Sequence, residues 1–166
     1  QPHTTTASTT PVDIQIEMRL ATANVLTLTN HPGSHSTSIT RQQLLMKQFH
    51  DAGCHVVGLQ ETRHRHLRDH SNPYYHIVGA PATGEGNDGV QFWISKTLAF
   101  YTDGPLVRKQ DILVVEAKPA YLIIKIKLPH WKCLFVTARA PHSGHGFSAA
   151  EKFWTTISAK IRQSSR

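Results

Sequence analysis

The chain has 166 residues, a length typical of one domain, and 39% of them are hydrophobic, which is enough to form a core. With 18 Lys and Arg against 11 Asp and Glu, the net charge is +7, a balance that favours a polyanionic partner but also fits an ordinary basic protein. No apolar run approaches the roughly 20 residues that span a bilayer, no signal peptide opens the chain, and its two cysteines are too few for a disulfide framework. We therefore exclude membrane-spanning and disulfide-rich secreted proteins and expect an intracellular environment, nuclear if the source is eukaryotic.

The beginning of the chain is polar and rich in threonine. Residues 1–13 have no hydrophobic periodicity, so we expect a disordered lead-in there. From Ile14 the apolar residues alternate, and this pattern predicts a first strand that ends near Asn24. A segment rich in glycine, proline and serine follows and predicts a loop.

A helix and a buried strand come next. Thr40 and Gln43 have the spacing of a capping box, which predicts a helix that runs as far as Gly53. The short apolar run 55–60 predicts a strand that is buried on both faces. The basic segment 62–73 predicts a loop, and its histidines lack the spacing of a zinc module, so we expect this loop near a nucleic-acid backbone.

The rest of the chain is mostly extended. Apolar alternation and β-branched residues predict strands at 74–82, 89–96, 112–117, 120–128 and 132–138. The glycine-rich segment 83–89 lacks the lysine of a phosphate-binding loop and predicts a hairpin connection. Ser148 and Glu151 form a second capping box that opens a helix over 148–163. This order of elements predicts an α/β domain with a mixed sheet.

Two polar residues stand where predicted strands end. Asn24 ends the first strand and Glu61 follows the strand 55–60, so neighbouring strands would bring both side chains to one edge of the sheet. A carboxylate there can hold a hard cation, and an amide can orient a phosphate or a water. Arg63 can face the same anion. Taken singly, such residues more often cap a turn or lie in solvent.

Several sequence blocks, in a fixed order, resemble the endonuclease/exonuclease/phosphatase superfamily and especially the apurinic-type endonuclease domains of non-LTR retrotransposons. The blocks are ATANVLTL (21–28), HVVGLQETR (55–63), GVQFWIS (89–95), LFVTARAPHSG (134–144) and the helix EKFWTTI (151–157). The resemblance implies a DNase I-like fold, which is a four-layer α/β sandwich with mixed, mainly antiparallel sheets and flanking helices. It covers the N-terminal half of that fold, so residues 14–166 would be a partial domain.

The resemblance also implies roles for the residues at the strand ends. Asn24 would position the scissile phosphate or its metal, and Glu61 would be a ligand of Mg²⁺ or Mn²⁺. Arg63 stands where many members have a basic residue beside the metal-binding Glu, which implies a phosphate contact for Arg63. The metal would polarise a phosphoryl oxygen and stabilise charge on the leaving oxygen.

The chain departs from the family pattern at two places. Arg139 stands where members usually have His or Tyr, and arginine can hold a phosphate but cannot exchange a proton near neutral pH. His142 is the candidate to compensate, although a loop histidine is more often solvated. No Asp-x-Asn or Ser-Asp-His run follows Pro141, so the residues that activate water in the family are absent. We therefore expect an apolar sheet face left uncovered, and little or no hydrolysis by these residues alone.

These observations leave three functions open. The first is Mg²⁺-dependent nicking of DNA by the endonuclease domain of a retrotransposon-type polyprotein. The second is a non-catalytic remnant of the same fold that binds nucleic acid, so whether this chain is an enzyme stays open. The third is a phosphatase or phosphodiesterase acting on inositol phosphates or phospholipids. The sequence does not decide the oligomeric state or the choice between DNA and RNA.

Overall fold

A computed structural model describes residues 13–28, 40–64, 72–141, 144 and 146–165. The predicted lead-in, apart from residue 13, and the candidate His142 lie outside the described residues. The elements in chain order are β1 (Leu20–Asn24), α1 (Arg41–Asp51), β2 (Val56–Gln60), β3 (Tyr75–Ala80), β4 (Val90–Ser95), the 3₁₀ turn η1 (Lys109–Asp111), β5 (Ile112–Lys118), β6 (Tyr121–Leu128), β7 (Trp131–Ala138) and α2 (Phe147–Ser164).

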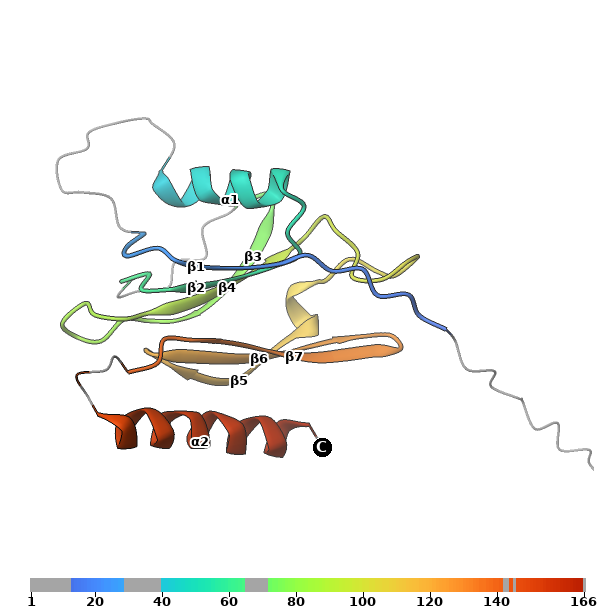
Figure 1. Cartoon of the computed structure of the whole chain (residues 1–166). Coiled ribbons are helices and arrows are strands. Elements are labelled where there is room, and N and C mark those ends of the chain that lie inside the picture. Colours follow the sequence, from blue (N-terminus) through green and yellow to red (C-terminus); the bar gives the residue numbers. More distant parts are fainter. Residues whose placement is uncertain (1–12, 29–39, 65–71, 142–143, 145, 166) are drawn as a thin grey trace, which may run out of the picture.

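The strands form two sheets that lie between the two helices (Figure 1). The first sheet has the order β1-β2-β4-β3, with β1 parallel to β2 and the other pairs antiparallel. The second sheet has the order β5-β6-β7 and is antiparallel throughout. Helix α1 covers the outer face of the first sheet and α2 covers the outer face of the second. The predicted α/β class, with mainly antiparallel pairing and flanking helices, is therefore confirmed.

The inner faces of the two sheets pack against each other. On β6 the alternate residues Leu122, Ile124 and Ile126 are fully buried, and they share one core with Phe92 and Ile94 of β4. Alternate side chains of a strand point to opposite faces, so this set belongs to the inner face of the second sheet. The prediction that an apolar sheet face would lie uncovered is thus wrong, because β5, β6 and β7 cover the first sheet.

Helix α1 begins where the sequence predicts. Thr40 accepts a hydrogen bond from the backbone of Gln43 at 3.2 Å, and the Gln43 side chain accepts one from the backbone of Thr40 at 2.9 Å. This capping box satisfies two of the amides that the first turn leaves unpaired. Met46 and Trp93 are buried between the helix and the sheet, so β2 is covered on both sides as predicted.

Helix α2 begins one residue earlier than predicted. Its first residue is Phe147 and its N-cap is Gly146, which offers no side-chain cap. The predicted capping box of Ser148 and Glu151 is wrong, because Ser148 already lies inside the first turn. Ile157 fixes the helix on the outer face of the second sheet. Within the described part of the chain, neither helix combines the length and apolar character that a bilayer crossing needs.

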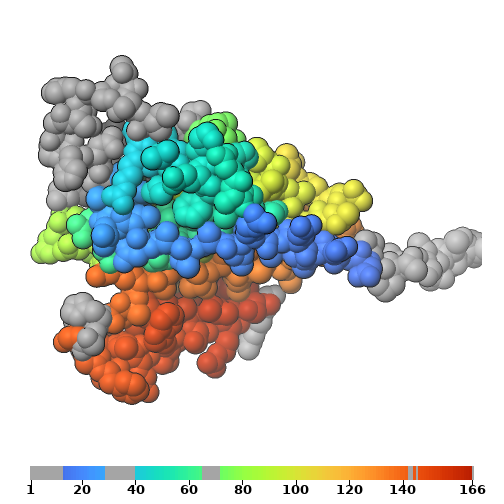
Figure 2. Space-filling model, turned by 45° about the horizontal axis from the view of Figure 1, so that its top comes forward, coloured from blue at the N-terminus to red at the C-terminus, as the bar shows by residue number. Residues whose placement is uncertain are grey.

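The first strand is shorter than predicted. Residues 14–19 do not join the sheet but run beside the segment after β4, where Ile16 pairs with Tyr101 in a single bridge. The backbone amide of Thr102 donates to the carbonyl of Gln15 at 3.2 Å. Figure 2 shows residues 13–28, in blue, as a stripe between α1 in cyan and the second sheet in orange. Alternation alone did not distinguish this packed extended segment from a sheet strand.

Candidate functional site

The ends of the parallel strands β1 and β2 bring an amide and a carboxylate together. Asn24 pairs in register with Gln60, the last residue of β2, and Glu61 follows directly. The side-chain amide of Asn24 donates to Oε1 of Glu61 at 2.8 Å. The prediction that Asn24 and Glu61 converge at one sheet edge is confirmed, as expected for the carboxyl ends of neighbouring parallel strands.

The backbone fixes which end of the Asn24 amide faces Glu61. The Asn24 Oδ1 atom accepts a hydrogen bond from the backbone amide of Leu26 at 3.2 Å. An asparagine amide has one acceptor end and one donor end, so its NH₂ group is left to point at the carboxylate. The backbone amide of Val25 also donates to the carbonyl of Gln60 at 3.0 Å, which continues the parallel pairing to the site.

Glu61 is a largely buried carboxylate among positive charges. Only 13% of its side chain is exposed, its Oε1 accepts a second hydrogen bond from Nε of Arg139 at 2.9 Å, and its Oε2 lies 3.7 Å from Arg63. The hydrogen bond from Asn24 lowers the pKa of Glu61, burial opposes this, and the two arginine charges add to the lowering. Glu61 is therefore ionised at neutral pH. Both arginines predicted for this site do reach it.

A second carboxylate, Asp88, completes the cluster and was missed by the sequence analysis. Arg139 follows the last residue of β7, and its Nη1 donates to Oδ1 of Asp88 while its Nε donates to Glu61. Burial tends to lower the pKa of Arg139, but the bonds to Asp88 and Glu61 outweigh it and raise that pKa. The signal for Asp88 lay in the antiparallel pairing of the strands 56–60 and 90–95, since residues just before the second strand must lie beside those just after the first.

The loops that carry the two carboxylates are held by unusual backbone conformations. Glu61, Arg63 and Asp88 all have positive φ angles, at 56°, 55° and 62°. The backbone amide of Arg63 donates to the carbonyl of Asp88 at 3.0 Å, and that of Thr62 donates to the carbonyl of Gly89 at 3.0 Å. Left-handed residues other than glycine cost conformational energy, and such strain gathers at functional sites.

Hydrogen bonds between the two sheets keep the cluster assembled. Nε2 of Gln60 donates to Oγ1 of Thr137, on β7, at 2.7 Å, where Thr137 is buried and Gln60 is partly buried. The backbone amide of Arg139 donates to the carbonyl of Ala120, in the turn between β5 and β6, at 2.8 Å. The cluster thus forms only where the edges of both sheets meet.

The carboxylates of the cluster are of the kind that could bind a hard cation such as Mg²⁺. Within the described residues no group of three or more His, Cys, Asp or Glu side chains gathers for a metal. Glu61 and Asp88 supply two carboxylates, and Mg²⁺ is commonly held by one or two carboxylates together with waters and phosphate oxygens. Both hydrogen bonds that Glu61 accepts from the described residues end on Oε1.

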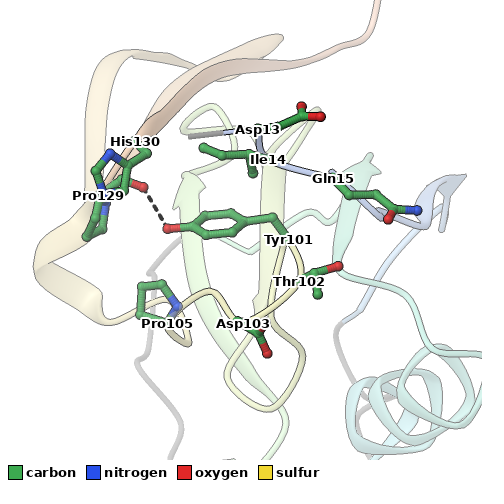
Figure 3. Close-up of a pocket in the computed structure, with 9 residues that line it drawn as sticks. All are labelled: Asp13, Ile14, Gln15, Tyr101, Thr102, Asp103, Pro105, Pro129 and His130. Carbon is green, nitrogen blue, oxygen red and sulfur yellow. Dashed lines mark hydrogen bonds between the residues drawn. The ribbon is translucent and has the colours of Figure 1, made fainter. Parts of the chain in front are cut away.

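A hollow of about 530 Å³ lies around Tyr101 (Figure 3). It is bordered by residues 13–15, by the segment around Tyr101 and by the β6–β7 turn at Pro129, whose carbonyl accepts from the Tyr101 hydroxyl at 2.6 Å. Strand β7 begins beside this hollow and ends at the cluster, so the two features lie at opposite ends of one strand. The hollow shares no residue with the predicted site.

A comparison with protein-family models finds no matching family, and a comparison with curated proteins finds no match.

Proposed function

We propose that this chain carries part of a divalent-metal-dependent phosphodiesterase domain with a DNase I-like fold, which acts on a nucleic-acid backbone. The observation that carries the proposal is the convergence of Asn24 and Glu61 at adjacent strand ends, bordered by Arg63 and Arg139. Glu61 can bind a hard metal ion, and the neighbouring guanidinium groups can bind phosphate oxygens. Together these groups suit the binding of a phosphodiester. The helix–sheet–sheet–helix layering supports the same fold.

Each residue has one role in this proposal. Glu61, with Asp88, would hold Mg²⁺ or Mn²⁺. Asn24 orients the Glu61 carboxylate and keeps it ionised. Arg63, with 47% of its side chain exposed, is free to contact a phosphate oxygen from solvent. When bound, the metal would polarise a phosphoryl oxygen and stabilise charge on the leaving oxygen.

We expect the chain to bind a phosphodiester better than it hydrolyses one. The groups that contact Glu61 among the described residues are one amide and two guanidiniums, and neither type of group exchanges a proton near neutral pH. Hydrolysis needs a group that activates water. This favours, as a second candidate, a domain that binds nucleic acid without cutting it.

Nucleic acid is the favoured partner because of the charge of the chain. The net charge is +7, and a phosphate backbone binds such a surface through the release of condensed counterions. Arg63 and Lys118, which is 56% exposed in its side chain, are two such cations on residues that follow or end strands. Affinity for DNA should therefore fall steeply as salt rises.

The test compares the wild type with Glu61→Gln for binding to a short fluorescent DNA duplex, in Mg²⁺ and in EDTA at equal ionic strength. Removing a negative charge should leave DNA affinity equal or higher in EDTA, where no cation is held. In Mg²⁺ the same variant should bind more weakly, because the cation that bridges Glu61 and phosphate is lost. This reversal of sign separates a metal ligand from a general charge effect. Arg108→Gln, which removes a cation paired with Asp111 on η1, is the control and should show no reversal.

Two outcomes decide between the candidates. If Glu61→Gln changes affinity equally with and without Mg²⁺, the metal-dependent proposal is wrong. If the reversal is found, a plasmid-nicking assay separates cutting from binding. Mg²⁺-dependent nicking that Glu61→Ala abolishes would overturn the expected inactivity and favour the endonuclease. Cation-dependent binding without nicking favours the second candidate.

A further inference from the structure

One guanidinium stands between the two carboxylates of the candidate site. We infer that Arg139 is an internal cation that competes with the divalent metal for Glu61 and Asp88, and that a phosphodiester draws Arg139 away and so promotes metal binding. This inference rests on the proposed function and deepens it, because it makes the binding of the cation and the binding of the phosphodiester depend on each other.

Arg139 bridges the two carboxylates. Its Nε donates to Oε1 of Glu61 at 2.9 Å and its Nη1 donates to Oδ1 of Asp88, so one side chain joins both acids. The acids come from different loops, one after β2 and one before β4. Two like charges brought this close require a cation nearby, and here the protein supplies it.

Arg139 and a divalent ion would compete for the same carboxylate groups. Oε1 of Glu61 already accepts hydrogen bonds from both Asn24 and Arg139, so a cation bound there meets an occupied oxygen. Arg139 bonds to both acids, so a cation held between them would lie close to its positive charge, and like charges repel at short separation. A divalent ion therefore binds better once this guanidinium has moved.

The side chain of Arg139 can move from the two acids to a bound phosphate. Its side chain is 39% exposed, against 13% for Glu61, so solvent reaches part of it. Its backbone amide remains bonded to the carbonyl of Ala120, which lets the side chain swing without loss of β7 pairing. Arginine binds phosphate oxygens through paired hydrogen bonds, which offset those it leaves. Two ligands that each favour the same displaced state bind cooperatively.

Arg63 offers a matched comparison on the same carboxylate. It carries the same charge, but it lies 3.7 Å from Oε2 of Glu61, beyond hydrogen-bond distance, and is more exposed. A general loss of positive charge would act alike at Arg63 and Arg139. Competition through hydrogen bonds to the ligand oxygens would make the effect larger at Arg139 than at Arg63.

The experiment measures Mn²⁺ binding by electron paramagnetic resonance for the wild type, Arg139→Gln, Arg63→Gln and Arg108→Gln. Arg139→Gln should bind Mn²⁺ about fivefold more tightly or better, a typical size for coupling between sites. Arg63→Gln should change the affinity less, and Arg108→Gln should not change it. The gain should vanish in the double variant with Glu61→Gln. Arg139→Leu, which keeps the aliphatic stem, repeats the test, and thermal melting of each variant verifies folding.

A second arm adds a dinucleotide that contains a single phosphodiester. It should raise the Mn²⁺ affinity of the wild type but leave that of Arg139→Gln nearly unchanged, because the competing cation is already absent. Equal gains for Arg63→Gln and Arg139→Gln, or the same dinucleotide effect in wild type and Arg139→Gln, would overturn the inference and leave the proposed function standing. Mn²⁺ binding that Glu61→Gln does not reduce in any variant would instead overturn the proposed function, and the inference with it.

Discussion

Gly89 supports the loop that places Asp88, and replacing it with alanine should be costly. Its φ angle is +86°, and an added Cβ would lie 2.9 Å from Oγ1 of Thr62 and 3.2 Å from the backbone nitrogen of Arg63. A left-handed residue with a Cβ costs about 1–2 kcal/mol, and overpacking costs about 1–3 kcal/mol. We expect Gly89→Ala to lose about 2–5 kcal/mol of a total stability that is typically about 5–15 kcal/mol.

Urea unfolding followed by tryptophan fluorescence measures this loss, since Trp93 is fully buried. The matched control is Gly84→Ala in the same loop, where an added Cβ meets nothing within 4 Å, so its stability should stay near that of the wild type. A double-mutant cycle with Thr62→Ala separates the clash from the φ strain, because only the clash involves Thr62. The reasoning is refuted if Gly89→Ala and Gly84→Ala unfold at the same urea concentration.

Three further changes test other parts of the structure. The hydrogen bond from Asn24 is the main cause that lowers the pKa of Glu61 below its usual value of about 4.3. Ionised Glu61 therefore contributes stability near neutral pH, and this contribution is lost as the pH falls through the folded-state pKa. Glu61→Gln should thus flatten the fall in urea midpoint between neutral pH and about pH 3, and an unchanged slope would contradict this. Thr137→Val removes the acceptor that Gln60 reaches at 2.7 Å and should cost about 1 kcal/mol in a thermal melt, whereas an unshifted melt would show that this bond adds nothing. Ile157→Ala should cost about 2–5 kcal/mol because the side chain is 3% exposed beneath α2, and a loss under 1 kcal/mol, by the same estimate, would mean that α2 docks weakly.

The sequence predicted the part of the site that depends on strand ends. Asn24 and Glu61 could be paired in advance because polar residues that end two apolar strands meet when those strands are parallel neighbours. The capping box at Thr40 could be predicted as well, since it depends on residues that are three positions apart. Residue spacing within a helix and the order of strands along the chain can both be inferred from a single sequence.

Features that depend on packing between distant segments could not be predicted in this way. Asp88 lies in a segment with the composition of a hairpin turn, and only the register of β2 and β4 puts it beside Arg63. The covering of the first sheet by the second requires knowledge of how the strand 120–128 folds back, which alternation does not contain. Ser148 was misread because Gly146 starts the helix earlier without a side-chain cap.

The cluster draws Glu61 and Asp88 from the side of the first sheet and Arg139 from the end of the second. The cluster is therefore complete only when the two sheets are packed together, so the site exists only in the folded domain. Any ion or ester that binds there shifts the folding equilibrium toward the docked form, so melting temperature becomes a direct readout of occupancy.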